Sequence, residues 1–134
     1  AVAAALQADG LVRINGVLSP SVASELLECV DASLGEALRQ TGDLEEFGAE
    51  WQARFGDIMK PRHRHDLKLS LEALPVREAL AALLGTLQPV LAASLGADAK
   101  LHELAALVSD PGAARQPMHP DTPMSFFEEA GEAD

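Results

Sequence analysis

The stretch from Ser19 to Gly42 constrains the fold most, because its apolar residues recur at four-residue steps and place one apolar stripe along a helix. Ser19 followed by Pro20 is a typical helix start, with serine as the N-cap and proline in the first helical position. Gly42 is a fitting end. The stripe consists of Val22, Leu26, Val30, Leu34 and Leu38. The sequence therefore predicts a long amphipathic helix in the first part of the chain.

A different period appears further along, where Asp66 to Leu71 alternates strictly between polar and apolar residues. Alternation at two-residue steps predicts a half-buried strand. Lys68 belongs to its polar face, which either lines a cavity or faces water. A second helix is predicted from Pro75 to about Leu95, with a kink or a division into two short helices at Gly85 and Pro89.

Three further stretches complete the expected α+β arrangement. Ala1 to Ala8 predicts a short helix, and Leu11 to Ile14 is β-leaning. Leu101 to Ser109 predicts a strand, because it is short and bounded by turn residues. Within it, His102 is either a further metal ligand or, as we favour, a histidine bonded within the sheet. On size, residues 1–134 correspond to a single domain.

Aromatic residues gather in the acidic stretch from Asp43 to Phe55, where Phe47, Trp51 and Phe55 recur at four-residue steps. This spacing predicts one aromatic face of a short helix. We interpret the rings as a cover for the core, because spacing alone predicts packing. The alternative is a lid or a wall of a substrate site.

Composition narrows the classes of function. The net charge of -11 argues against binding a nucleic-acid backbone and against adsorption to an anionic membrane surface. No apolar run approaches the roughly 20 residues that span a bilayer, so no membrane partner is expected. The single Cys29 excludes an intramolecular disulfide and is expected to be a small core residue. It fits a reducing compartment, and a cytoplasmic location is expected.

A cationic cluster stands out in this acidic chain, within the irregular stretch before the predicted strand. It consists of Lys60, Arg62, His63, Arg64 and His65. A solvated loop explains such a cluster, and a site for an anionic substrate or co-substrate is the alternative.

The residues from Gln116 to Pro123 contain a pair suited to metal binding, His119 and Asp121. Each proline in this stretch pushes the residue before it, including His119, towards an extended conformation. Side chains at i and i+2 of an extended backbone leave on the same side, so an imidazole nitrogen and a carboxylate oxygen could reach one ion. A His-x-Asp pair with a distant second histidine is the sequence form of the facial triad that holds non-haem Fe(II).

Residues 110–122, Asp-Pro-Gly-Ala-Ala-Arg-Gln-Pro-Met-His-Pro-Asp-Thr, resemble a known segment. The segment that they resemble carries the first two iron ligands in phytanoyl-CoA dioxygenase-like Fe(II)/2-oxoglutarate-dependent oxygenases. The stretch from Asp9 to Ser19, followed by a helix, also resembles that family's N-terminal strand and helix. The resemblance implies a double-stranded β-helix (jelly-roll) fold with N-terminal helices, and oxidation of a small organic substrate.

The resemblance also implies roles for individual residues. His119 and Asp121 would be Fe(II) ligands, and Lys68 and Gln116 would be polar groups near the 2-oxoglutarate co-substrate. In that family a distal histidine ligand and an oxoglutarate-binding arginine lie well downstream, and neither follows Asp121 here. We therefore expect the chain to be the N-terminal portion of such an oxygenase, with the C-terminal remainder of the fold as its partner. We expect this portion alone to be inactive.

A reading from a different class stays open. The chain would then be an acidic helical interaction domain, with His119-Pro120-Asp121 as a structural turn that caps backbone groups without a metal. On either reading, the acidic tail at 125–134 is expected to be poorly ordered.

Overall fold

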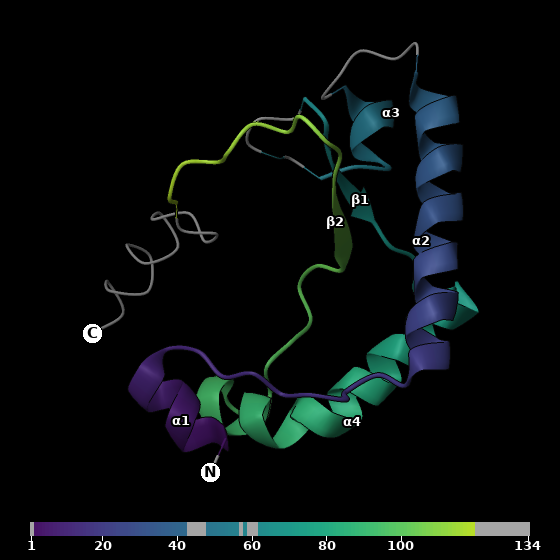
Figure 1. Ribbon diagram of the computed structural model, residues 1–134. Coiled ribbons are helices and arrows are strands. Elements are labelled where there is room, and N and C mark those ends of the chain that lie inside the picture. The colour runs from purple at the N-terminus through teal and green to yellow at the C-terminus, as the bar shows by residue number, and fades with distance from the viewer. Residues whose placement is uncertain (1, 43–47, 57, 59–61, 120–134) are drawn as a thin grey trace.

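The structure, a computed structural model, describes residues 2–42, 48–56, 58 and 62–119. It combines four helices with one two-stranded antiparallel sheet among these residues, which confirms the α+β class (Figure 1). The elements are α1 (Val2–Asp9), α2 (Pro20–Thr41), α3 (Ala49–Gln52), β1 (Arg64–Lys68), α4 (Leu74–Leu95) and β2 (Ala105–Ser109). Helices α1 and α2 both contact α4.

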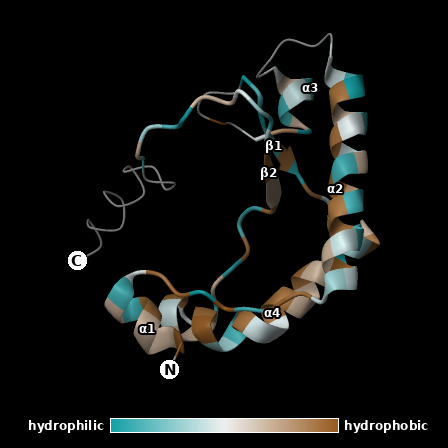
Figure 2. Cartoon of the chain, viewed as in Figure 1, coloured by the Kyte–Doolittle hydropathy of each residue, from teal (hydrophilic) through white to brown (hydrophobic). Residues whose placement is uncertain are grey.

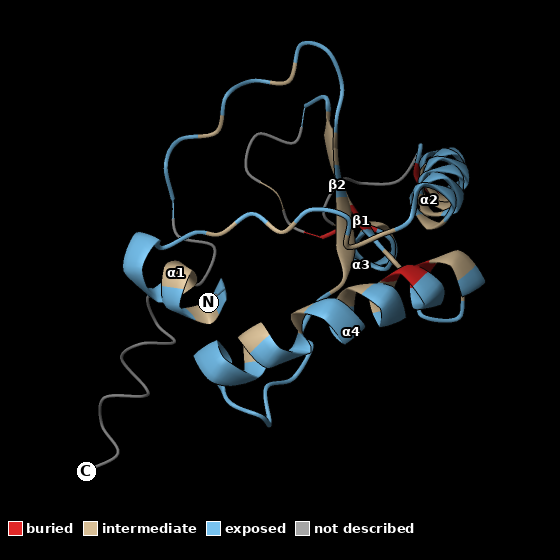
Figure 3. Cartoon of the chain, turned by 60° about the horizontal axis from the view of Figure 1, so that its bottom comes forward, coloured by how far each residue is buried: buried red, intermediate tan, exposed pale blue. Residues whose placement is uncertain are grey.

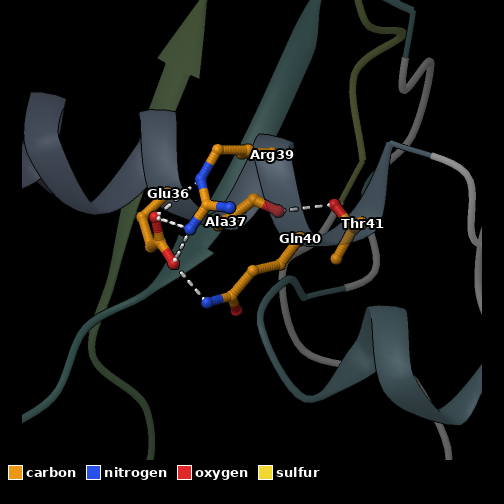
Figure 4. Close-up of polar contacts among 5 residues, drawn as sticks. All are labelled: Glu36, Ala37, Arg39, Gln40 and Thr41. Atoms are coloured by element: carbon orange, nitrogen blue, oxygen red, sulfur yellow. Dashed lines mark hydrogen bonds and ion pairs between the residues drawn. The ribbon is translucent and has the colours of Figure 1, made fainter.

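Helix α2 has the start and the end that its sequence predicts. Ser19 is the N-cap, and its Oγ accepts a hydrogen bond from the Val22 N–H at 3.3 Å. The helix ends at Thr41, whose hydroxyl donates to the Ala37 carbonyl at 2.8 Å. On the exposed side of this last turn, Arg39 forms an ion pair with Glu36 (Figure 4). A local signal, the Ser19 cap followed by Pro20, therefore sets the start of α2.

Strand β1 is the centre of the sheet region. It pairs antiparallel with β2, with Arg64 opposite Ser109 at one end and Lys68 opposite Ala105 at the other. Its other edge is hydrogen-bonded to the residues after α3. The Gly56 N–H donates to the Asp66 carbonyl at 2.8 Å, and the Lys68 N–H donates to the Arg54 carbonyl at 2.9 Å. Between these two bonds, Phe55 and Leu67 form an isolated antiparallel bridge.

The core is small and lies where α2, α3 and β1 meet. Its buried residues are Phe55, Leu67 and Ala37, with Phe55 only 1% exposed. The partly buried residues packed against it are Val30, Leu34, Trp51 and Leu69. The Trp51 and Phe55 rings have centroids 5.1 Å apart. The interpretation of these two rings as core cover is confirmed, and Phe47 lies outside the described residues.

Helix α4 runs without a break from Leu74 to Leu95, so the predicted division into two short helices is wrong. Pro89 lies inside it and lacks the N–H that would bond to the Gly85 carbonyl. Gly85 has no side chain that would crowd the turn in which the proline ring lies. The helix ends at Leu95, as predicted, and Gly96, with φ 95°, is its C-cap.

Most of the α4 surface is exposed (Figure 3), although much of it is apolar (Figure 2). Only Val76 and Ala79 are buried, while Leu84 and Leu95 expose 40% and 68% of their surfaces. By length and composition, α4 is the one helix in the described residues that could cross a membrane, with a mean hydropathy of 1.4 over its most apolar window. Core helices of soluble proteins meet the same criterion, so the absence of a membrane partner stays a prediction.

Three strand boundaries differ from those expected. Leu11 to Ile14 forms no strand, because a strand needs a neighbour for its backbone groups and the described residues offer this stretch none. Strand β1 begins earlier and ends before Leu71, which lies in a turn and is 48% exposed. Strand β2 begins only at Ala105, so His102 precedes it and is exposed. The predicted tail at 125–134 lies outside the described residues.

Candidate functional site

The segment after β2 carries the predicted metal ligand. A turn at Asp110 leads into residues 113–119, which are neither helix nor strand, as the prolines predict. At its end, His119 is exposed, and its Nδ1 lies 2.7 Å from the Pro117 carbonyl oxygen. Asp121, the second predicted ligand, lies outside the described residues.

The contact between His119 and Pro117 fixes the form of the imidazole. A carbonyl oxygen only accepts hydrogen bonds, so Nδ1 carries the proton and donates it. In the neutral ring the lone pair then belongs to Nε2. Metal-binding histidines in proteins typically donate one ring N–H to a backbone carbonyl and coordinate through the other nitrogen. His119 therefore has the tautomer that a metal ligand needs.

A second feature, a charged pocket of about 430 Å³, surrounds Lys68. Lys68 and Asp66 leave β1 on the same side, two residues apart. Glu103 reaches the pocket from the residues before β2. The other lining residues are Gln52, Phe55 and Gly56. The Lys68 ammonium donates to the Gln52 backbone carbonyl at 2.6 Å and so ties β1 to the end of α3.

Carboxylates dominate the electrostatics of this charged pocket. Partial burial raises the pKa of Asp66, the nearby Glu103 carboxylate raises it further, and the Lys68 ammonium partly offsets both effects. Gly56 is buried beneath these groups. A side-chain carbon on Gly56 would overlap with Asp66 Oδ2 and lie 3.4 Å from Glu103 Oε1. Glycine at this position therefore leaves room for the Asp66 carboxylate.

The structure does not bring Lys68 and His119 together. Lys68 is opposite Ala105, the first residue of β2, whereas the segment to His119 leaves from the other end of that strand. These ends are the first and the last of five paired residues, about 13 Å apart along the strand. Gln116, the other candidate for 2-oxoglutarate, is partly buried in the same segment as His119. Among the described residues, the predicted site residues thus fall into two groups, Lys68 in one and Gln116 with His119 in the other.

Two residues of the cationic cluster, Arg64 and His65, contact the segment after β2. Arg64 Nη2 donates to the Ala114 carbonyl at 3.0 Å, and His65 Nε2 lies 3.5 Å from Asp110 Oδ2. Arg62 and His63 are exposed, and Lys60 lies outside the described residues. Neither of the two readings offered for this cluster, a solvated loop or an anion site, anticipated these contacts with the segment after β2.

A third feature is an apolar pocket of about 700 Å³ at the C-terminal end of α4. Leu84, Leu91 and Leu95 of α4 line it, together with Leu101 from the segment that follows. His102 lines its edge rather than sitting in a sheet. The sequence carries a signal for this surface in the broad apolar face of the helix. It does not reveal that the face stays uncovered among the described residues.

Asp66, Glu103 and Gly56 were not among the predicted site residues. Asp66 shares the polar face of β1 with Lys68, so its spacing is a signal that could have found it. Glu103 and Gly56 meet Asp66 only through pairing between distant segments. The described residues contain no group of three side chains able to hold a metal ion. Comparison with models of protein families, with curated proteins and with solved structures finds no match to this chain.

Proposed function

We propose that this chain carries the His-x-Asp half of a non-haem Fe(II) site in a 2-oxoglutarate-dependent oxygenase that acts on a small organic substrate. In this proposal β1 and β2 are the first strands of a jelly roll whose remainder supplies the rest of the site. The observation that supports it is the 2.7 Å contact between His119 Nδ1 and the Pro117 carbonyl oxygen. It gives His119 the tautomer of a metal ligand in an irregular, proline-flanked segment.

Different residues of this segment would have different roles in metal binding. His119 would bind through Nε2, while the Pro117 carbonyl holds the ring proton on Nδ1 and limits rotation of the imidazole. Asp121 would supply a carboxylate oxygen from two residues further along. A third ligand must come from outside these two residues. When bound, Fe(II) supplies the oxidising chemistry of such enzymes, and the protein positions the substrate and excludes water.

The charged pocket around Lys68 does not fit 2-oxoglutarate as it stands. The Lys68 ammonium already donates to the Gln52 carbonyl, and the Asp66 and Glu103 carboxylates would repel a dicarboxylate. The role of Lys68 towards 2-oxoglutarate stays a prediction without support from this geometry. Gln116, in the segment of His119, has a neutral amide side chain, which does not repel a dicarboxylate.

Anaerobic titration with Fe(II), followed by calorimetry, tests the metal half of the proposal. We expect His119→Ala and Asp121→Ala each to weaken Fe(II) binding by at least about tenfold, since each removes one ligand. His102→Ala is the matched control, because it removes an exposed histidine elsewhere. With two of three ligands present, we expect no succinate from 2-oxoglutarate in this chain alone. Equal affinities in the wild type, His119→Ala and His102→Ala would overturn the proposal.

The second candidate is an acidic interaction domain without a metal, and the uncovered apolar surface of α4 favours it. Leu95 and Leu101 expose 68% and 56% of their surfaces beside the apolar pocket. Solvent-exposed apolar surface of this kind marks interaction sites in soluble proteins. The same titration separates the two functions, because an interaction domain predicts no Fe(II) binding that depends on His119.

A further inference from the structure

The segment that leads to the proposed metal ligand is held at its start by the residues that open β1. Arg64 and Ser109 are paired at the end of the sheet, and Asp110 begins the segment. The Asp110 N–H donates to the His63 carbonyl at 2.9 Å, and the Ala113 N–H donates to the Asp110 carbonyl at 3.1 Å. Backbone hydrogen bonds therefore fix the turn, and among the described residues they reach no further than Ala113.

The Arg64 side chain continues where these backbone bonds stop. Its Nε lies 3.3 Å from Ser109 Oγ, before the turn, and its Nη2 donates to the Ala114 carbonyl at 3.0 Å, after the turn. A guanidinium is planar and holds its donors in a fixed fork. Two contacts from one such group on both sides of a turn set the direction in which the chain leaves it.

The neighbours of Arg64 contact the same turn. His65 Nε2 lies 3.5 Å from Asp110 Oδ2, and this histidine is largely buried while the aspartate is half-exposed. His63 adopts a left-handed conformation with φ 62°, which is uncommon for a residue with a side chain. Its ring faces Gly112, where an added side-chain carbon would lie 3.8 Å from His63 Cδ2. Three consecutive residues thus converge on the turn after β2.

We propose that Arg64 is a positioning residue. Its guanidinium orients residues 113–119 as they leave β2 and so sets the direction from which His119 meets a metal ion. The metal role rests on the proposed function, whereas the ordering of the segment rests on the contacts of Arg64 with Ser109 and Ala114 alone. Arginine suits this task because its charge does not titrate in the physiological range and its fork reaches both acceptors at once.

Two measurements on the full chain test the proposal. The heteronuclear ¹⁵N–¹H NOE of the amides from Ala113 to Gln116 reports the order of the segment on the picosecond-to-nanosecond timescale. Anaerobic Fe(II) titration reports metal affinity. The variants are Arg64→Met, which keeps the aliphatic bulk, and Arg64→Lys, which keeps the charge. Arg39→Met is the matched control, since it removes an arginine that pairs with Glu36 on the exposed side of α2.

We expect Arg64→Met to lower these NOE values relative to β2 and to weaken Fe(II) binding about tenfold, as loss of outer-shell support does at other metal sites. Arg64→Lys should fall between Arg64→Met and the wild type, and Arg39→Met should match the wild type. Should Arg64→Met fail to fold, Ser109→Ala removes one acceptor of Arg64 and should give a smaller fall in the NOE.

Unchanged NOE values in Arg64→Met would overturn the ordering role. A lowered NOE with unchanged Fe(II) affinity would overturn the positioning role. If the wild type itself shows no Fe(II) binding that depends on His119, the proposed function is wrong. The metal role of Arg64 is then also wrong, because it rests on that function. The NOE comparison then still decides whether Arg64 orders the segment.

Discussion

Replacement of Phe55 by alanine should destabilise this protein more than any exposed apolar replacement. Phe55 is the largest fully buried side chain, at 1% exposure, and it joins α3 to β1 through its bridge with Leu67. Truncation of a buried phenylalanine to alanine costs about 3–5 kcal/mol, because transfer free energy and cavity terms add. Proteins are stable by about 5–15 kcal/mol in total, so this change removes a large share.

The small size of the core affects how much stability Phe55→Ala should remove. Among the described residues, Phe55 is one of three buried residues in its cluster, so few neighbours can move to fill the cavity. We therefore expect a loss in the upper part of that range. The loss should also disturb the charged pocket, because Phe55 lines it and the neighbouring Gly56 is bonded to Asp66.

Urea denaturation measures the effect. Trp51 is the single tryptophan and its ring lies beside Phe55, so its fluorescence reports this core directly. Far-UV circular dichroism provides a second probe that does not depend on that contact. Leu95→Ala is the control, since a 68% exposed leucine should change the free energy of unfolding by no more than about 0.5 kcal/mol. A Phe55→Ala loss indistinguishable from that of Leu95→Ala would refute the assignment of the core.

Three further changes test other parts of the structure. Gly56→Ala should destabilise the chain and displace the Asp66 carboxylate, because the added carbon overlaps with that carboxylate. A crystal structure of the variant, or its Asp66 chemical shifts, measures the displacement. An Asp66 unchanged from the wild type would contradict this expectation. The pKa of Asp66 is raised in the folded state, so the folded chain holds this proton more tightly than the unfolded chain. The free energy of unfolding should therefore fall as the pH rises above 3.8, the ordinary pKa of an aspartate. Denaturation curves of Asp66→Asn at several pH values should lack this part of the pH dependence. Ser19→Ala should lower stability by about 1 kcal/mol through loss of the N-cap, measured by thermal unfolding, whereas Ser19→Asp should retain the cap.

The two groups of candidate residues lead to different chemistry. The segment of His119 offers a nitrogen ligand held in one tautomer, which suits a metal ion. The charged pocket offers two carboxylates and an ammonium that is already bonded to Gln52. Because the ends of β2 separate them, a substitution in one group should leave the other intact. That separation lets metal binding and pocket electrostatics be tested independently.

Features that depend on neighbours along the chain could be predicted from the sequence. The N-cap at Ser19, the end of α4 at Gly96 and the irregular path towards His119 each follow from dihedral preferences of one or two residues. The packing of Trp51 with Phe55 follows from their four-residue spacing. These effects act within one turn or one dipeptide, so no distant segment is needed to produce them.

Features that depend on distant segments could not be predicted. Pairing with β2 decided where β1 begins and ends, and the same register placed Lys68 and the segment of His119 at opposite ends of the sheet. It also brought Glu103 to Asp66 and Arg64 to Ala114. Periodicity specifies which face of a strand is apolar, but a strand's partner and register depend on free energies of packing summed over the whole chain. The tertiary arrangement therefore assigned the charged residues to their partners, whereas local sequence had already set the helices and the proline-bounded segment that ends at His119.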